Sequence, residues 1–170
     1  TAREHAPTLV VTRFDRQMGD DGVLSRLHQE DMCQVLGIPP EIKYAEHPEN
    51  ERHPSYTRFA TLLERRSFEP RVELVRLLEH VTAHLALGNT DAHAKNTSVF
   101  HDASGGLRLA PLYDVVPTTA FISQRHFGIS VAGKFVITEI TREHLVREAS
   151  SWNVPERVSR ETIDRALNAM

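Results

Sequence analysis

The sequence predicts a mainly helical lobe that carries one small β-hairpin. Apolar residues recur at close to 3.6-residue spacing from Pro70 to Gly88, which indicates a long helix. Two short runs with apolar positions, Thr97–Phe100 and Leu107–Leu112, are joined by the turn-rich segment HDASGG, which indicates a hairpin. With 170 residues and 40% hydrophobic content, the chain is long enough for one domain with a buried core.

The N-terminal third contains shorter elements. Thr8–Phe14 (TLVVTRF) is typical of a short strand and is followed by a turn-prone segment, Gly19–Gly22. Asp31–Leu36 predicts a short helix that Gly37 and the prolines after it bring to an end.

Two helices are expected in the middle of the chain. Ser55 is a helix cap for a segment that runs to about Arg66, with apolar residues at Phe59, Leu62 and Leu63. Pro70 suits the first turn of the long helix, and Gly88 suits its C-terminal stop. The apolar residues that define the long helix are Val72, Val75, Leu78, Val81, Leu85 and Leu87.

The C-terminal part predicts two more helices. One runs from Thr141, a candidate N-cap, to about Trp152. The other runs from Pro155, in its first turn, to Met170.

Three polar residues flank the predicted hairpin. Asp91 and Asn96 lie in the loop before it, and Asp114 lies in the loop after it. Because a hairpin returns the chain to its starting point, Asn96 and Asp114 should be close in space. Carboxylate and amide oxygens suit Mg²⁺, which takes one or two protein carboxylates together with substrate phosphates. The order Asp, Asn, Asp therefore indicates Mg-dependent phosphoryl transfer.

The spacing within the first loop is also informative. Asp91 precedes Asn96 by five positions, as the Asp and Asn do in the kinase catalytic loop H-R-D-x-x-x-x-N. The loop itself reads Asn89-Thr90-Asp91, and Asp114 is followed by Val-Val where an ordinary protein kinase has Phe-Gly. The pattern predicts kinase-like chemistry without an ordinary protein-kinase sequence.

Several motifs together resemble one family. NTDAHAKNTS (Asn89–Ser98) and PLYDVV from Pro111 resemble the catalytic core of the HipA-like serine/threonine kinases. TRFDR (Thr12–Arg16) resembles the hinge segment of that family, and LHQEDMCQVLG (Leu27–Gly37), together with Pro39, Pro40 and Lys43-Tyr44, resembles the segment after it. The tail from His126 resembles its C-terminal region more loosely. The resemblance implies a protein-kinase-like C-terminal lobe, with a hinge strand in residues 1–16, a catalytic core in 17–125 and C-terminal helices in 126–170.

The resemblance also implies a set of site residues. The catalytic residues are Asp91 and Lys95, where Lys95 would meet the transferred phosphate, and the Mg²⁺ ligands are Asn96 and Asp114. The residues expected to contact ATP are Thr12, Arg13, Phe14, Gln29, His93, Ala94, Lys95, Asn96, Tyr113 and Asp114.

Three of these positions have a structural alternative. His93 suits either nucleotide contact or a local contact that holds the loop, and Lys95 suits either phosphate contact or a solvated surface charge. The polar cluster around Gln29 suits either a contact with the sugar of the nucleotide or simple helix capping by Asp31.

The family resemblance extends to partners. Only eleven residues precede Thr12, so the glycine-rich phosphate loop and the lysine of the family's N-terminal lobe have no counterpart here. We expect that lobe in cis, as part of a longer kinase, or in trans, as the other half of a split kinase. The resemblance further implies a protein Ser/Thr substrate, for which the family suggests an aminoacyl-tRNA synthetase, and a DNA-binding antitoxin partner.

Composition excludes several other classes of protein. The net charge is −3, without the basic excess of a nucleic-acid-binding surface, so direct nucleic-acid binding is not expected. The single cysteine, Cys33, permits no intrachain disulfide and favours a reducing cytoplasm. We see neither a signal peptide nor an apolar run long enough for a membrane span.

Two alternatives to a kinase lobe stay open. The first is a non-catalytic or split-kinase binding module with the same fold. The second is a metal-dependent hydrolase built on His80 and His84, which share a helix face, with Asp91, His93 and His101 nearby in the sequence. The segment between the two histidines is Val-Thr-Ala, so the Glu of an H-E-x-x-H motif is missing.

Overall fold

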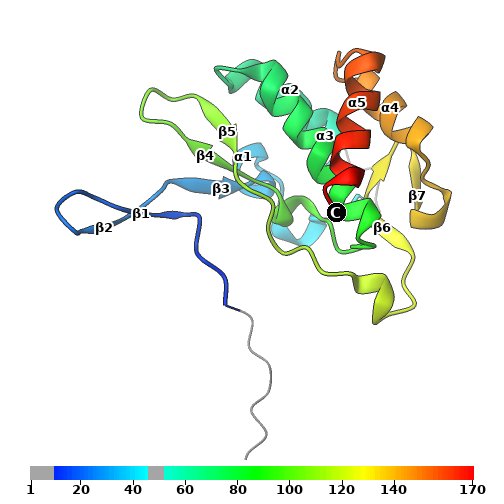
Figure 1. Cartoon of the computed structure of the whole chain (residues 1–170), viewed down its shortest axis with the longest axis horizontal. Helices are drawn as coiled ribbons and strands as arrows, with labels where there is room; N and C mark the ends of the chain where they lie inside the picture. Colours follow the sequence, from blue (N-terminus) through cyan, green and yellow to red (C-terminus); the bar gives the residue numbers. More distant parts are fainter. Residues whose placement is uncertain (1–9, 46–51) are drawn as a thin grey trace, which may run out of the picture.

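A computed structural model describes residues 10–45 and 52–170 of the chain. A group of helices packs beside a central three-stranded sheet, and two further hairpins lie at the ends of the molecule (Figure 1). The structure is 43% helix and 17% strand, so the expected mainly helical lobe is corrected to a mixed α/β fold. The difference arises because strand pairing in this protein is not confined to the single predicted hairpin.

The central sheet has the antiparallel order β3-β4-β5, formed by Gln29–Asp31, Ser98–His101 and Leu107–Leu109. The hairpin predicted between the two polar loops is therefore confirmed as β4 and β5. On its other side β4 pairs with β3, a strand that the sequence did not predict and that overlaps the predicted helix only at Asp31. The pairing aligns Gln29 with Phe100 and Asp31 with Ser98.

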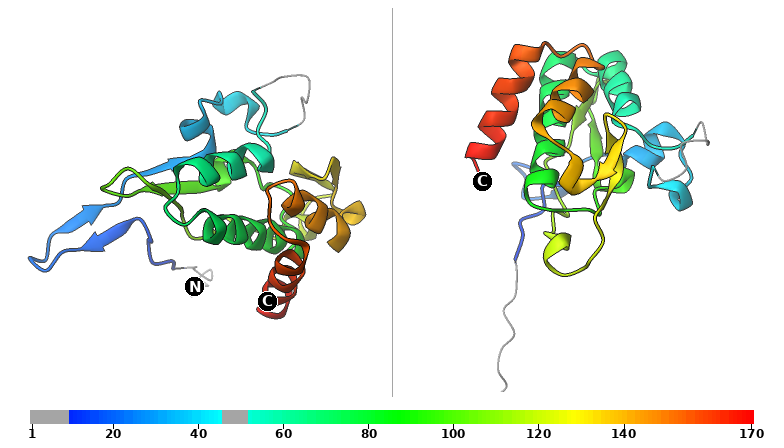
Figure 2. Two further views of the ribbon diagram at one scale, coloured as in Figure 1. Left: turned by 90° about the horizontal axis from the view of Figure 1, so that it is seen from above. Right: turned by 90° about the vertical axis from the view of Figure 1, so that its right-hand side faces the viewer.

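A second hairpin pairs β1 (Arg16–Met18) with β2 (Leu24–Arg26) and extends away from the helices (Figure 2). The strand predicted at Thr8–Phe14 is wrong in its described part, because residues 10–14 form no strand, while residues 8 and 9 lie outside the described range. Strand β1 begins at Arg16 because Arg16 pairs with Arg26, the last residue of its partner strand β2. Val10 and Val11 are exposed instead.

The helix caps predicted at Asp31 and Ser55 are confirmed. Helix α1 (Met32–Leu36) begins at Asp31, whose side chain accepts a hydrogen bond from the backbone of Gln34, and it ends at Gly37 with a φ of 63°. Helix α2 (Tyr56–Arg66) begins at Ser55, whose hydroxyl accepts from the backbone N–H of Arg58.

Helix α3 (Pro70–Ala86) crosses the core, but its predicted buried face is partly wrong. Val72 and Leu87 are 43% and 42% exposed, whereas Leu74 and Leu77 are buried beside Leu78 and Val81. The helix packs against α2, α5 (Glu156–Asn168) and the central sheet at once, so its buried surface is wider than one stripe. Among the helices of the described ranges, we find none with the length and apolar character needed to cross a bilayer.

The two predicted C-terminal helices are confirmed as α4 (Arg142–Ser150) and α5, which pack against each other. The hairpin before them, β6 (His126–Val131) with β7 (Lys134–Val136), was not predicted from the sequence. Phe127, Ile129 and Val131 alternate along β6 and are buried in the core.

Candidate active site

The predicted catalytic loop begins where α3 ends. Gly88 has a φ of 71°, which turns the chain out of the helix, and the backbone N–H of Asn89 donates to the carbonyl of His84 (2.9 Å). Strand β6 lies close against this loop. A Cβ atom on Gly128 would lie 2.7 Å from the carbonyl oxygen of Ala92, so only glycine fits there without a shift of backbone.

Asn89 is completely buried and connects three parts of the site. Its Nδ2 group donates to the carbonyl oxygen of Asp114 (3.1 Å) and lies 2.9 Å from Nδ1 of His84. Its Oδ1 atom accepts from the backbone N–H of Asp91 (3.1 Å). One side chain thus joins α3, the loop before the hairpin and the loop after it. This linking role of Asn89 was not predicted from the sequence.

Asp91 presents its carboxylate at the surface of this loop, with 48% of the side chain exposed. The phenol of Tyr44 donates a hydrogen bond to Oδ1 of Asp91 (2.5 Å), and Nε2 of His93 lies 3.9 Å from the same oxygen. A carboxylate that is oriented by a fixed donor and open to solvent is suited to accept a proton from a bound hydroxyl.

Asn96 and Asp114 both offer oxygen atoms to this site. Asn96 donates a hydrogen bond from Nδ2 to the carbonyl of Asp91 (2.9 Å). Its Oδ1 atom is the part of the amide that could ligate a metal ion. Asp114 is a non-glycine residue with a φ of 54°, a strained conformation that recurs at functional sites. Within residues 10–45 and 52–170, no donor forms a hydrogen bond to its carboxylate. An amide oxygen and an unpaired carboxylate fit the ligand preference of Mg²⁺.

His93 is buried, and its two ring nitrogens differ. The ammonium of Lys43 lies 2.8 Å from Nε2. Burial and the charge of Lys43 lower the pKa of His93, although the carboxylates of Asp91 and Asp114 act in the opposite direction. The ring is therefore neutral near pH 7, accepts at Nε2 and carries its hydrogen on Nδ1. That Nδ1 is buried without a hydrogen-bond partner in the described part of the chain.

Lys95 and Tyr113 are joined through the backbone. The Lys95 ammonium pairs with Oδ2 of Asp31 (3.1 Å), so it is not simply a solvated charge. The hydroxyl of Tyr113 donates to the carbonyl of Lys95 (2.5 Å) and lies 2.6 Å from Oγ of Ser98, and burial raises the pKa of Tyr113 to about 12. Ala94, the residue before Lys95, is buried, and its backbone N–H donates a hydrogen bond to the carbonyl of Lys43 (3.1 Å).

One face of the central sheet continues the site. Gln29 and Phe100 are cross-strand partners and project from the same face. The ring of Phe14 packs against Phe100, with centroids 5.9 Å apart, and against Tyr113, with centroids 5.8 Å apart. Oε1 of Gln29 is buried and has no hydrogen-bond partner among the described residues.

Thr12 and Arg13 lie at the edge of this arrangement. Both are exposed, and the guanidinium of Arg13 forms two hydrogen bonds to the carboxylate of Asp15 (2.8 and 2.6 Å). These bonds hold the pKa of Asp15 below its usual range. In the described ranges no hydrogen bond connects Thr12 or Arg13 to the catalytic loop, so Phe14 alone links the hinge segment to the site.

The two histidines of the hydrolase alternative have structural surroundings. Burial lowers the pKa of His80 and of His84 to about 4, and Nδ1 of His84 contacts Asn89. Across residues 10–45 and 52–170, these two rings do not gather with Asp91 and His93 into a group close enough to share a metal ion. The structure therefore gives no support to a zinc hydrolase at this helix.

Comparison with known proteins decides the family. The whole chain, residues 1–170, matches the family model described as HipA-like C-terminal domain. The chain belongs to this family. The resemblance predicted from the catalytic-core motifs is thereby confirmed.

Two proteins of Sinorhizobium fredii (strain NBRC 101917 / NGR234) are similar in sequence to the chain. "Putative kinase Y4mE" is 45% identical over 115 residues, which cover 68% of the chain and 26% of the relative. "Putative kinase Y4dM" is 26% identical over 167 residues, which cover 95% of the chain and 37% of the relative. The chain thus spans about a quarter to just over a third of the length of these relatives.

A solved structure shares the HipA-like fold. It is the toxin–antitoxin system HipA, HipB and operator DNA complex of Shewanella oneidensis MR-1. The match has a TM-score of 0.77 and 23% identity, and it covers 92% of the chain and 40% of the solved one. At this identity, the likeness shows the fold.

Proposed function

We propose that this HipA-like domain is the catalytic lobe of an ATP- and Mg²⁺-dependent kinase that phosphorylates a Ser or Thr hydroxyl of a protein. One observation carries the proposal. Buried side-chain atoms without a hydrogen-bond partner are rare in proteins, and the described residues contain two, Oε1 of Gln29 and Nδ1 of His93. Both belong to residues that the sequence predicts to contact the nucleotide, and we propose the nucleotide as the missing partner of both.

The residues of the two loops divide the chemistry. Asn96 and Asp114 would hold Mg²⁺, which when bound neutralises charge on the phosphates. Asp91 orients the substrate hydroxyl and accepts its proton, while Tyr44 holds the carboxylate in place through the 2.5 Å hydrogen bond to Oδ1. Positioning and electrostatics supply most of the rate in reactions of this class.

The remaining predicted residues would bind the nucleotide. His93 offers its Nδ1 hydrogen to a phosphate oxygen, and Lys95 exchanges its ion pair with Asp31 for the transferred phosphate. Phe14 and Tyr113 form an aromatic surface at the hinge, beside the backbone of Thr12 and Arg13. The side-chain amide of Gln29 would form a hydrogen bond with the sugar of the nucleotide.

The domain would work with a second lobe. Because the chain spans 26% and 37% of the two relatives named above, we propose that the phosphate loop and its lysine are supplied by other sequence, in cis or in trans. The solved HipA structure contains HipB and operator DNA, and we propose a DNA-binding antitoxin as a partner here as well. An aminoacyl-tRNA synthetase is the protein substrate that we propose to test first.

Calorimetric titration with ATP in the presence of Mg²⁺ tests the proposal. We expect saturable binding that depends on Mg²⁺ and is lost in Asp114→Ala. The matched control is Asp20→Ala, which removes the same charge from an exposed turn residue outside the site. Equal affinity in Asp114→Ala and the control would refute the metal assignment. Binding without any ATP turnover, even with an N-terminal lobe added, would favour the non-catalytic module.

A further inference from the structure

The edge of the central sheet carries a second group of ligand-type side chains. His28 directly precedes β3, Glu30 lies within it, and His101 ends β4. The backbone N–H of His101 donates to the carbonyl of His28 (3.0 Å), so the two histidines continue the ladder as cross-strand partners. Residues two apart on a strand share a face, so all three side chains project to one side of the sheet.

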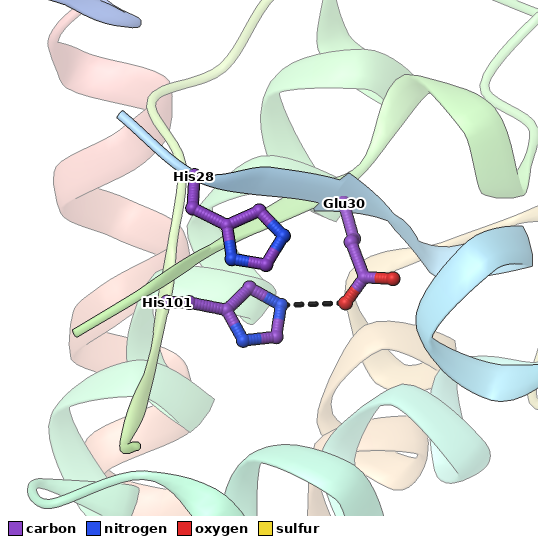
Figure 3. Close-up of side chains that lie close together, drawn as sticks. All are labelled: His28, Glu30 and His101. Carbon is purple, nitrogen blue, oxygen red and sulfur yellow. Dashed lines mark hydrogen bonds and ion pairs between the residues drawn. The ribbon is translucent and has the colours of Figure 1, made fainter. Parts of the chain in front are cut away.

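The three side chains converge. Figure 3 shows both imidazole rings directed toward the carboxylate of Glu30. Nε2 of His101 lies 2.6 Å from Oε2 of Glu30, and the rings of His28 and His101 stack with centroids 4.2 Å apart. One ligand atom from each residue lies within 4.8 Å of the other two. The ligand atoms of a tetrahedral zinc ion are about 3.3 Å apart, so the three ligand atoms would have to approach one another by up to about 1.5 Å to hold an ion.

The donor set identifies the class of metal. Two imidazole nitrogens and one carboxylate oxygen suit Zn²⁺, whereas Mg²⁺ and Ca²⁺ prefer oxygen ligands throughout. In the part of the chain that the structure describes, this is the one group of three or more His, Cys, Asp or Glu residues so close together. The side chains of His101 and Glu30 are 24% and 31% exposed, so an ion can enter from solvent.

We propose that His28, Glu30 and His101 form a Zn²⁺ site with an open fourth position for water or for a ligand from a partner. The alternative is a metal-free arrangement in which Glu30 pairs with His101 and the ring of His28 stacks on that of His101, and titration with Zn²⁺ distinguishes the two. The bound ion would link β3 to β4. Gln29 lies between two of the ligands and projects from the opposite face of the sheet, so the ion would also fix the strand that carries Gln29.

Titration of the metal-free protein with Zn²⁺ tests this site. After treatment with EDTA and removal of the chelator, we expect one ion per chain at micromolar Zn²⁺ and a rise in melting temperature. The variants His28→Gln, Glu30→Gln and His101→Gln should each lower the affinity at least about tenfold. Because His28 is exposed, its replacement tests the site without a risk to folding.

Two controls separate this site from others. His126→Gln removes an exposed histidine at the start of β6, and Asp114→Ala removes the proposed magnesium ligand. Both should bind Zn²⁺ as the unaltered protein does. The zinc proposal is overturned by the absence of one-to-one binding, by equal affinity in the three ligand variants, or by a loss confined to Asp114→Ala.

Discussion

Asn89 donates a hydrogen bond from its buried side chain to the backbone carbonyl of Asp114, which lies 25 residues further along the chain. The same side chain accepts from the backbone of Asp91. The relative position of the two acidic residues therefore depends on one buried amide, and on the hairpin that brings the second loop back to the first.

Asn89→Ala should lower both stability and nucleotide binding. The substitution leaves the carbonyl of Asp114 and the backbone N–H of Asp91 without their partner, and each buried unsatisfied group costs about 1–3 kcal/mol. We expect a loss of about 2 kcal/mol or more in the free energy of unfolding, measured by urea denaturation. Asn168→Ala, at the exposed end of α5, is the control and should change little. Unchanged stability in Asn89→Ala would contradict the linking role.

Tyr44→Phe should separate catalysis from binding. The phenol contacts the proposed catalytic carboxylate and belongs to none of the residues that we assign to the nucleotide. A hydrogen bond to a charged group is worth about 1.5–3 kcal/mol, so ATP turnover should fall about tenfold or more. ATP affinity should stay within about twofold, a change of no more than about 0.4 kcal/mol. Turnover equal to that of the unaltered protein would show that Tyr44 does not orient Asp91.

Stability should fall between pH 6.5 and pH 4. Burial lowers the pKa of His84 to about 4 from an ordinary value of 6.5. As pH falls through 6.5, the unfolded chain takes up a proton that the folded chain refuses, so the folded state loses free energy until about pH 4. The loss from this group amounts to up to about 3 kcal/mol. Urea denaturation at pH 7.5 and pH 5 should show about 2 kcal/mol of this loss, the part that arises between pH 6.5 and pH 5.

A histidine replacement tests which group causes the pH dependence. His84→Gln keeps an acceptor for Asn89 but cannot titrate, so its stability should vary less between the two pH values. His126→Gln, at an exposed position, should retain the full dependence. The same slope in both variants would mean that other groups are responsible.

Gly128→Ala should displace the catalytic loop. The added Cβ would lie 2.7 Å from the carbonyl oxygen of Ala92 and 3.1 Å from the backbone nitrogen of His93, and backbone atoms cannot move aside as a flexible side chain does. Overpacking of this kind costs about 1–3 kcal/mol, and ATP affinity should fall with it. Gly105→Ala, in the hairpin turn with a φ of 89°, should cost stability through strain but leave ATP affinity unchanged. Equal ATP affinity in the two variants would refute the contact.

The sequence predicted the elements whose signals are local. Asp31 and Ser55 mark the starts of helices because their side chains accept hydrogen bonds from the first turn. Pro70 and Gly88 lie at the two ends of the long helix α3. The hairpin β4–β5 followed from a turn-rich segment between two short apolar runs. These features need no knowledge of the rest of the fold.

The parts that were missed depend on contacts across the chain. Lys43 and Tyr44 reach His93 and Asp91, which are 50 and 47 residues away, respectively; the family resemblance included Lys43 and Tyr44 but did not indicate these contacts. The proposed zinc ligands were missed for the same reason. The spacing of His28 and Glu30 indicates a metal site only once the pairing of β3 with β4 brings His101 beside them. For Asn89, its position two residues before Asp91 was the available signal.

A crystal structure of the chain with Mg²⁺ and a non-hydrolysable ATP analogue would locate both the metal ion and the nucleotide. We expect a metal ion ligated by Asn96 and Asp114, a phosphate oxygen on Nδ1 of His93, and a sugar near Gln29. A nucleotide bound elsewhere, or a metal ion that contacts neither Asn96 nor Asp114, would contradict it.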